Sequence, residues 1–141
     1  MSKNPRSVLF VCNQNSVRSP LAYALADQYA KRRIYIDSAG LVTRELDPFV
    51  AQVMHEIGYD LTDHKAKTLQ DLTLEDFDLV ISLTSQSYDR LLSKLADSDT
   101  EVEFWPTEDP CMMEGNRSQI MEVYRKVRDE LSARIEKRLS F

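Results

Sequence analysis

The sequence predicts an α/β protein that forms one domain over residues 1–141. Its expected architecture is a three-layer sandwich, in which a four-stranded parallel sheet carries helices on both faces. Three observations predict this class. Short apolar runs rich in strand-forming residues alternate with segments of helical spacing. The length of 141 residues is that of one domain, and 43% hydrophobic against 29% charged residues is the balance of a globular protein.

Four runs have the length and composition of strands, and the first and third are typical of strands buried on both faces. The first is the VLFVC run at 8–12, which contains only apolar residues. The second is expected at 34–36 and leads into a turn over 37–40. The other two are expected at 78–83 and 102–105.

Helices are expected between and after these strands. Two begin at cap-plus-proline pairs, Ser19-Pro20 and Asp47-Pro48. A third is expected over 85–96, and a fourth from about Ser118. In the fourth, an apolar stripe repeats every three or four positions: Ile120, Val123, Tyr124, Val127, Leu131, Ile135 and Leu139.

The loops at the carboxyl ends of the strands are where a site is expected, because parallel sheets bind their ligands there. These loops span 13–18, 38–46, 84–87 and 106–115.

The overall charge limits the classes of partner. The 18 Lys and Arg against 23 Asp and Glu leave a net charge of -5, which argues against nucleic-acid or membrane-surface binding. The two cysteines, Cys12 and Cys111, are too few for a disulfide scaffold or a zinc site, and no metal or cofactor is expected. No apolar run approaches the roughly 20 residues of a membrane span. We therefore expect a cytoplasmic protein; its oligomeric state stays open.

The main chemical signal is a cysteine at the end of the first strand, with Arg18 six residues later at the mouth of a helix. A loop wound between a strand and a helix directs backbone N–H groups inward and forms an anion site. Those N–H groups, Arg18 and a nearby hydroxyl stabilise a thiolate at Cys12. The planar guanidinium of an arginine binds two oxygens of a phosphate-like group. This pattern predicts a nucleophile aimed at a tetrahedral oxyanion.

The stretch VLFVCNQNSVRSP resembles the signature of the low-molecular-weight protein tyrosine phosphatase superfamily, which includes thioredoxin-coupled arsenate reductases. The resemblance covers nearly the whole chain and follows the family's order of motifs. It extends to the DSAG stretch at 37–40, to HKAK at 64–67, to DLVISL at 78–83 and to Asp109-Pro110. The closing VYRKVRDELSARI stretch resembles the ends of the arsenate-reductase-like branch.

The resemblance implies a role for each matching residue. Cys12 is the nucleophile that forms a phosphocysteine, and Arg18 holds the phosphate oxygens. Asp109 is the general acid and then the base that activates water. The loop residues Asn13, Gln14, Asn15, Ser16 and Val17 bind phosphate. Ser19 donates to the Cys12 thiolate, and His64 supports the brace formed by Asn15.

Three functions stay open at this stage. The first is hydrolysis of phosphomonoesters, on a phosphotyrosine protein or on a small phosphorylated compound. The second is arsenate reduction, in which a small thiol or Cys111 resolves the Cys12 adduct. The third is a catalytically degenerate domain that binds anions or a protein partner, because Gln14 stands where the family has glycine. Val17 replaces the family's redox cysteine, so Cys111 is the candidate redox partner of Cys12.

Overall fold

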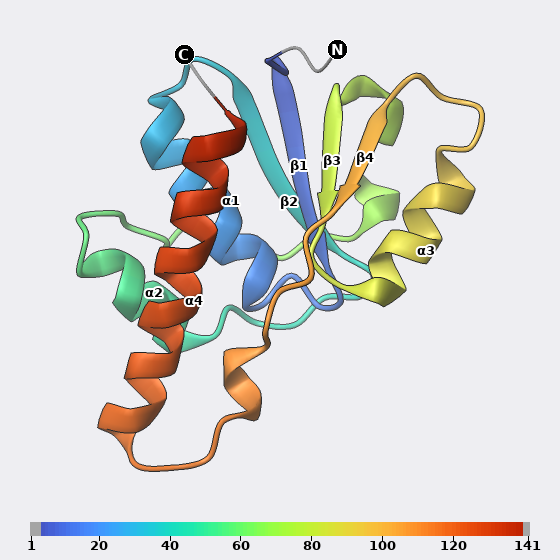
Figure 1. Cartoon of the computed structure of the whole chain (residues 1–141). Helices are drawn as coiled ribbons and strands as arrows, with labels where there is room; N and C mark the ends of the chain where they lie inside the picture. The colour runs from blue at the N-terminus through green and yellow to red at the C-terminus, as the bar shows by residue number, and fades with distance from the viewer. Residues whose placement is uncertain (1–3, 140–141) are drawn as a thin grey trace.

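A computed structural model describes residues 4–139 and contains one four-stranded parallel sheet (Figure 1). The strands are β1 (Ser7–Cys12), β2 (Tyr35–Gly40), β3 (Leu79–Ser82) and β4 (Glu101–Phe104), in the order β2-β1-β3-β4. β1 pairs with β2 on one side and β3 on the other, so its carboxyl end lies between the carboxyl ends of two neighbouring strands. The predicted fold class is confirmed.

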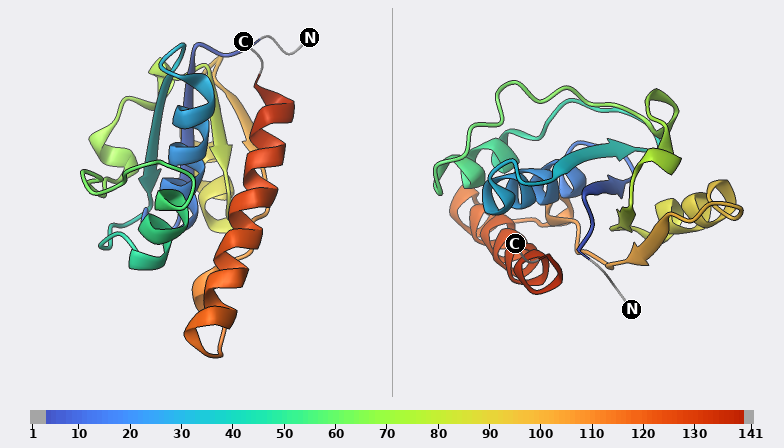
Figure 2. Two further views of the ribbon diagram at one scale, coloured as in Figure 1. Left: turned by 90° about the vertical axis from the view of Figure 1, so that its left-hand side faces the viewer. Right: turned by 90° about the horizontal axis from the view of Figure 1, so that it is seen from above.

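The helices cover both faces of the sheet (Figure 2). On one face lie α1 (Arg18–Ala30), α2 (Pro48–His55) and the long α4 (Arg117–Arg138). On the other face lies α3 (Ser85–Lys94), next to short 3-10 turns at 69–71 and 74–76. The three layers bring the start of α1 to the carboxyl end of β1, where the site was expected.

Alternation along β1 divides the core into two apolar clusters, because successive strand side chains point to opposite faces. Val8, Phe10 and Cys12 pack with α1, α2 and α4, whereas Leu9 and Val11 belong to the cluster on the α3 face. All five are at most 2% exposed. A fully buried side chain of this size contributes about 1.5–3 kcal/mol to folding, so the strand that ends at Cys12 is held rigidly.

The start of α1 differs from the prediction. The helix begins at Arg18, so Ser19 and Pro20 lie in its first turn and Ser19 is not the N-cap. Val17 precedes the helix and makes no side-chain capping bond. The Ser19 hydroxyl instead contacts Cys12, as described below. The first N–H groups of α1 are therefore not used by a side-chain cap, and that of Ser19 donates to Cys12 Sγ.

The segment 37–40 also differs from the prediction of a turn. It forms the last four of the six residues of β2 and pairs with Leu9 through Cys12 of β1. The run contains residue types that favour turns, but the chain does not reverse there. Glycine is needed at position 40 because the backbone packs closely around it. An added Cβ on Gly40 would lie 2.5–2.8 Å from backbone atoms of Val42, Asn15 and Gln14.

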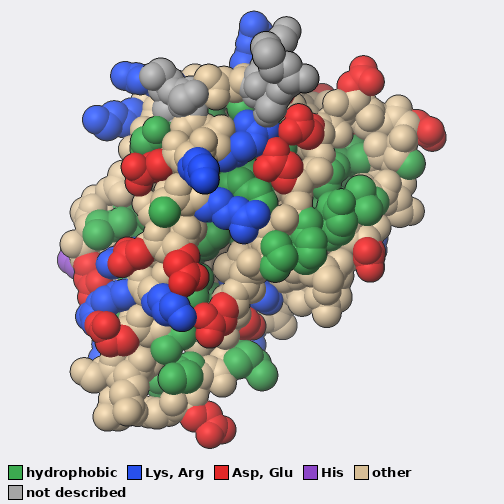
Figure 3. Space-filling view, viewed as in Figure 1, with side chains coloured by type: hydrophobic (Ala, Val, Ile, Leu, Met, Phe, Trp, Pro, Cys, Tyr) green, Lys and Arg blue, Asp and Glu red, His purple; other side chains and the backbone are tan. Residues whose placement is uncertain are grey.

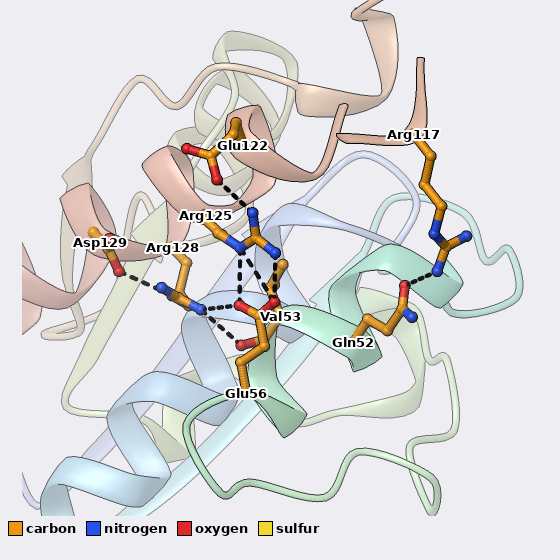
Figure 4. A network of polar contacts seen from close by, with 8 residues as sticks. All are labelled: Gln52, Val53, Glu56, Arg117, Glu122, Arg125, Arg128 and Asp129. Atoms are coloured by element: carbon orange, nitrogen blue, oxygen red, sulfur yellow. Dashed lines mark hydrogen bonds and ion pairs between the residues drawn. The ribbon is translucent and has the colours of Figure 1, made fainter. Parts of the chain in front are cut away.

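An ionic cluster fixes α2 against α4 (Figure 4). The Glu56 carboxylate, just after α2, accepts hydrogen bonds from Arg125 and Arg128 of α4. Arg128 also donates to the Val53 carbonyl at 2.9 Å, and Arg117 donates to Gln52 at 2.7 Å. The hydrogen bond from Arg125 keeps the pKa of the Glu56 carboxyl below its ordinary value. The second half of α2 is thereby tied to α4.

The visible surface of α4 carries charged side chains of both signs, whereas hydrophobic side chains gather near β4 (Figure 3). Within residues 4–139, no helix combines the length and the apolar character that crossing a bilayer requires.

Candidate active site

Cys12 is the last residue of β1, and its sulfur lies beside the first turn of α1. The residue is only 2% exposed. Cys12 Sγ and Ser19 Oγ are 2.9 Å apart, and the Ser19 N–H donates to Cys12 Sγ at 3.4 Å. The Ser19 hydroxyl also lies 3.2 Å from the Ala39 carbonyl, to which it can donate. The Ser19 N–H therefore faces the sulfur, and the single hydroxyl hydrogen of Ser19 can turn from the Ala39 carbonyl to a thiolate at Cys12.

The loop 13–17 has its carbonyl groups turned outward. Leu41 donates to the carbonyls of both Cys12 and Asn13, and Arg44 donates to that of Gln14. The Ser16 carbonyl accepts from Asp47, and the Val17 carbonyl accepts from Leu21 of α1. Since the carbonyls point away from the centre, the N–H groups of the loop are left to face an anion.

Asn15 is the brace of this loop, and the structure places it there as expected. It is fully buried and has φ of 52°, a left-handed conformation that asparagine adopts more readily than most residues. Its amide donates to Ser19 Oγ at 2.8 Å and to Ser38 Oγ at 3.0 Å. Its Oδ1 accepts from the Lys67 N–H at 3.0 Å.

Gln14 does not need to be a glycine for the backbone to follow this path. Within 13–17, positive φ occurs at Asn15 alone, and the Gln14 side chain is exposed. The chain thus forms the loop with a side chain at this position that stays outside the buried core. The absence of glycine at position 14 does not favour the degenerate-domain interpretation on backbone grounds.

His64 supports Asn15 from the outer side. Its Nε2 lies 3.3 Å from the Asn15 carbonyl, which can only accept, so Nε2 carries the hydrogen. His64 is partly buried, and this burial lowers the pKa of its imidazole below the ordinary value. The resemblance implied a partner of Asn15 at this position.

The lowered pKa of His64 predicts a loss of stability in acid. The unfolded chain binds a proton near the ordinary imidazole pKa of about 6.5, whereas the folded protein resists protonation to lower pH. The contribution is therefore complete above that value and is lost as pH falls below it. We expect the free energy of unfolding to fall less steeply between pH 6.5 and 5 in His64→Gln than in the native protein.

Urea unfolding at several pH values measures this slope. The matched control is His55→Gln, because His55 is the other histidine of the chain and is exposed. An unchanged slope in His64→Gln contradicts the prediction.

Arg18 and Asp109 face one another across the mouth of the loop. The Arg18 guanidinium lies 3.6 Å from Asp109 Oδ2 and donates to the Thr107 carbonyl at 3.2 Å. The other Asp109 oxygen accepts from the Cys111 N–H at 3.1 Å, which starts a short 3-10 turn over Pro110–Met112. The loop 106–115 thus brings a carboxylate next to the arginine that follows the anion loop.

A cavity of about 630 Å³ joins these groups. Eight of the predicted residues line it: Cys12, Asn13, Gln14, Ser16, Val17, Arg18, Asp109 and Cys111. Asn15 and Ser19 are fully buried, and Asn15 joins Ser19 to His64 through hydrogen bonds. The rest of the lining contains apolar side chains, which include Leu46, Phe49, Met112, Met113 and Ile120, together with charged Arg44, Glu45 and Asp47.

Val17, which replaces the family's cysteine, and Cys111, the candidate redox partner of Cys12, have different surroundings. Val17 is 9% exposed and packs into the core cluster with α1, α2 and α4. Cys111 lies in the cavity wall and is a free thiol, as is Cys12. Partial desolvation and the neighbouring Asp109 carboxylate raise the pKa of the Cys111 thiol to about 11, although the residue as a whole is exposed.

Buried hydroxyl groups hold the first residue of the loop. Thr84 Oγ1 lies 2.8 Å from Asn13 Oδ1, to which it can donate, and also contacts Ser87 Oγ at 2.7 Å. Ser82 Oγ lies 2.5 Å from Ser87 Oγ. The expected loop at 84–87 therefore reaches the site through Asn13 as the start of α3.

Several supporting residues were missed by sequence reasoning. Ser38, Gly40, Lys67 and Thr84 contact the loop directly, and Tyr124 donates to the carboxylate of Asp47 in the cavity wall at 2.6 Å. The DSAG and HKAK motifs were the only available signals for the first three. Within residues 4–139, no group of three or more His, Cys, Asp or Glu side chains could share a metal ion.

Comparison with known proteins places this geometry in context. The model of the family described as low molecular weight phosphotyrosine protein phosphatase matches residues 7–140. An arsenate reductase of Shouchella clausii is 31% identical over 137 residues, which cover 97% of this chain and 96% of that protein.

Two solved structures have the same fold. The low molecular weight protein tyrosine phosphatase from T. tengcongensis has a TM-score of 0.79 at 29% identity, covering 93% of this chain and 95% of that one. The YwlE arginine phosphatase from Geobacillus stearothermophilus has a TM-score of 0.77 at 26% identity, with coverages of 94% and 90%.

Proposed function

The chain belongs to the low molecular weight phosphotyrosine protein phosphatase family, and on this basis we propose that it hydrolyses phosphomonoesters through a cysteinyl-phosphate on Cys12. The observation that carries the proposal is the position of the Cys12 sulfur. It lies at the base of a loop with outward carbonyls, in one cavity with Arg18 and Asp109. These groups supply a nucleophile, an anion site and a proton donor.

In the first step, the Cys12 thiolate attacks phosphorus and the bond from phosphorus to the leaving oxygen breaks. Asp109 donates its proton to that oxygen, so the product leaves as a neutral alcohol or phenol. Arg18 turns from the Thr107 carbonyl and Asp109 to bind two phosphate oxygens. The inward N–H groups of 13–17 stabilise the charge on the same oxygens.

In the second step, Asp109 is a carboxylate and removes a proton from water. The water oxygen attacks phosphorus, the bond between sulfur and phosphorus breaks, and inorganic phosphate is released. The Ser19 hydroxyl, 2.9 Å from the sulfur, stabilises the departing thiolate.

The Asp109→Asn variant should lose hydrolysis in a way that depends on the leaving group. An amide cannot donate an acidic proton, and a general acid contributes about 10²- to 10⁴-fold to rate. We expect a larger loss of kcat on phenyl phosphate than on p-nitrophenyl phosphate, whose product is a weaker base. Steady-state rates on the two esters measure the difference.

Glu108→Gln is the matched control, because Glu108 is adjacent, exposed and loses the same charge. Equal losses on both esters in Asp109→Asn would assign Asp109 a role in binding instead.

The overall proposal is tested with the purified protein and p-nitrophenyl phosphate. We expect metal-independent release of phosphate and a phosphorylated Cys12 peptide after rapid acid quenching, detected by mass spectrometry. A protein that binds phosphate in calorimetry but neither turns over nor traps phosphocysteine is the catalytically degenerate domain. The rates of hydrolysis of phosphotyrosine and phosphoarginine peptides then show which class of substrate the cavity accepts.

Arsenate reduction is a second candidate, because Cys111 lines the cavity that contains Cys12 and a relative is named arsenate reductase. Cys12 would condense with arsenate and release water. The Cys111 thiolate would then attack Cys12 Sγ, forming a disulfide while the electron pair of the sulfur–arsenic bond reduces arsenic to arsenite. An external dithiol would reduce the disulfide.

The pKa of Cys111 disfavours the route through Cys111, whereas a small thiol could still resolve the Cys12 adduct. With a pKa of about 11, only about one thiol in 10⁴ is ionised at pH 7, and the thiolate is the attacking species. We expect any arsenite release with dithiothreitol and arsenate to be independent of Cys111. Arsenite production that is lost in Cys111→Ser would establish reduction as an activity.

A further inference from the structure

A partly buried ion pair lies behind the anion loop, outside the cavity. Lys67 Nζ is 3.0 Å from Asp37 Oδ1 and 3.1 Å from Asp37 Oδ2. The Asp37 side chain is 11% exposed and that of Lys67 is 34% exposed. Asp37 belongs to β2 and also accepts from the Ser38 N–H at 2.8 Å and from the Tyr35 hydroxyl at 3.2 Å.

The backbone of Lys67 leads from this pair to the loop. Its N–H donates to Asn15 Oδ1 at 3.0 Å, and its carbonyl accepts from the Gly40 N–H at 2.9 Å. Three residues earlier, His64 donates to the Asn15 carbonyl. The segment 64–67 therefore makes two hydrogen bonds to Asn15. The ion pair with Asp37 and the hydrogen bond from Gly40 join the same segment to β2.

Asp37 is connected to Asn15 by a second route through the adjacent residue. Ser38 Oγ accepts from the Asn15 amide at 3.0 Å, and the Ser38 N–H is bound to the Asp37 carboxylate. The carboxylate thus fixes β2 and the segment 64–67 relative to each other, and both hold Asn15 in its left-handed conformation.

We propose that Asp37 and Lys67 are positioning residues whose ion pair sets the affinity of the loop 13–17 for the phosphate group. The inference deepens the function proposed above and rests on it. Ion pairs with a partly exposed member contribute little to folding stability. A displacement of the loop of about 1 Å, in contrast, lowers catalysis by up to about 100-fold. The effect of breaking the pair should therefore be larger on phosphate binding than on unfolding.

The experiment compares Lys67→Met with Lys67→Arg. We expect Lys67→Met to weaken binding of inorganic phosphate in calorimetry by about tenfold or more, and to lower kcat/KM on p-nitrophenyl phosphate similarly. Lys67→Arg should restore both values to within about threefold, because a guanidinium also binds a carboxylate through two donors. Measurements are made well below the melting temperature of each variant.

Two further variants make the result specific. Lys65→Met is the matched control, because Lys65 is exposed and lies in the same segment; it should leave binding unchanged. The double variant Asp37→Asn/Lys67→Met removes the unpaired carboxylate, so it provides a folded test if Lys67→Met does not fold.

The outcomes separate this inference from the proposed function. Phosphate binding within twofold of the native value in Lys67→Met, or in the double variant where Lys67→Met does not fold, overturns it. An equal loss in Lys65→Met or no rescue by Lys67→Arg also overturns it. If the native protein binds phosphate but does not hydrolyse the ester, the proposed function fails, and calorimetry still decides the role of the pair.

Discussion

The Cys12→Ser variant should fold normally and lose turnover of p-nitrophenyl phosphate by roughly 10⁴-fold or more. Serine occupies nearly the same volume, so the core packing of β1 and the contact with Ser19 are kept. A hydroxyl, however, is a much weaker nucleophile than a thiolate unless a base activates it. Initial rates at saturating substrate measure the loss, and circular dichroism reports the fold.

Cys111→Ser is the matched control, because it replaces the same sulfur in the wall of the same cavity. It should keep hydrolysis within a few-fold of the native rate. Retained hydrolysis in Cys12→Ser would show that another group attacks phosphorus.

The Gly40→Ala variant should lose phosphate binding although no side chain of the site is removed. The added Cβ would lie 2.5 Å from the Val42 carbonyl oxygen, 2.6 Å from the Asn15 nitrogen and 2.8 Å from the Gln14 carbonyl carbon. All three are backbone atoms, so the loop must move away from β2. Such overpacking costs about 1–3 kcal/mol of stability. We expect kcat/KM and affinity for inorganic phosphate to fall by roughly 100-fold.

Gly58→Ala separates loop displacement from loss of stability. Gly58 has φ of 84° and open space around its Cα, so alanine strains the backbone there without touching the site. This control should lower the melting temperature and leave phosphate affinity intact. If Gly40→Ala binds phosphate as the native protein does, the contact between β2 and the loop does not position the amides.

The sequence allowed the layers and the chemical centre to be predicted, because both depend on local patterns. Apolar runs and helical spacing defined the strands and helices, and the strand–polar–helix order located Cys12 and Arg18. The turn predicted over 37–40 was wrong for a non-local reason. Asp37, Ser38 and Gly40 are residue types that favour turns, but pairing with β1 outweighs that preference.

The supporting contacts could not be predicted from local pattern. Lys67 contributes its backbone N–H to Asn15, and a main-chain donor leaves no mark on the identity of the residue. Ser19 was expected to cap α1, but its hydroxyl lies against a sulfur seven residues earlier. Which acceptor a hydroxyl uses depends on tertiary distances that the order of residues does not contain.

The outward carbonyls of the loop have a consequence for the speed of the chemical step. Donors to them come from Leu41, Arg44, Asp47, Leu21 and His64, on three different parts of the chain. In water, dipoles must reorient around a developing negative charge, and this reorganisation is a large part of the barrier. Here the peptide dipoles are aligned before any substrate arrives, since turning one would break a hydrogen bond outside the loop. The reorganisation free energy is therefore met during folding, and it does not recur in each catalytic cycle.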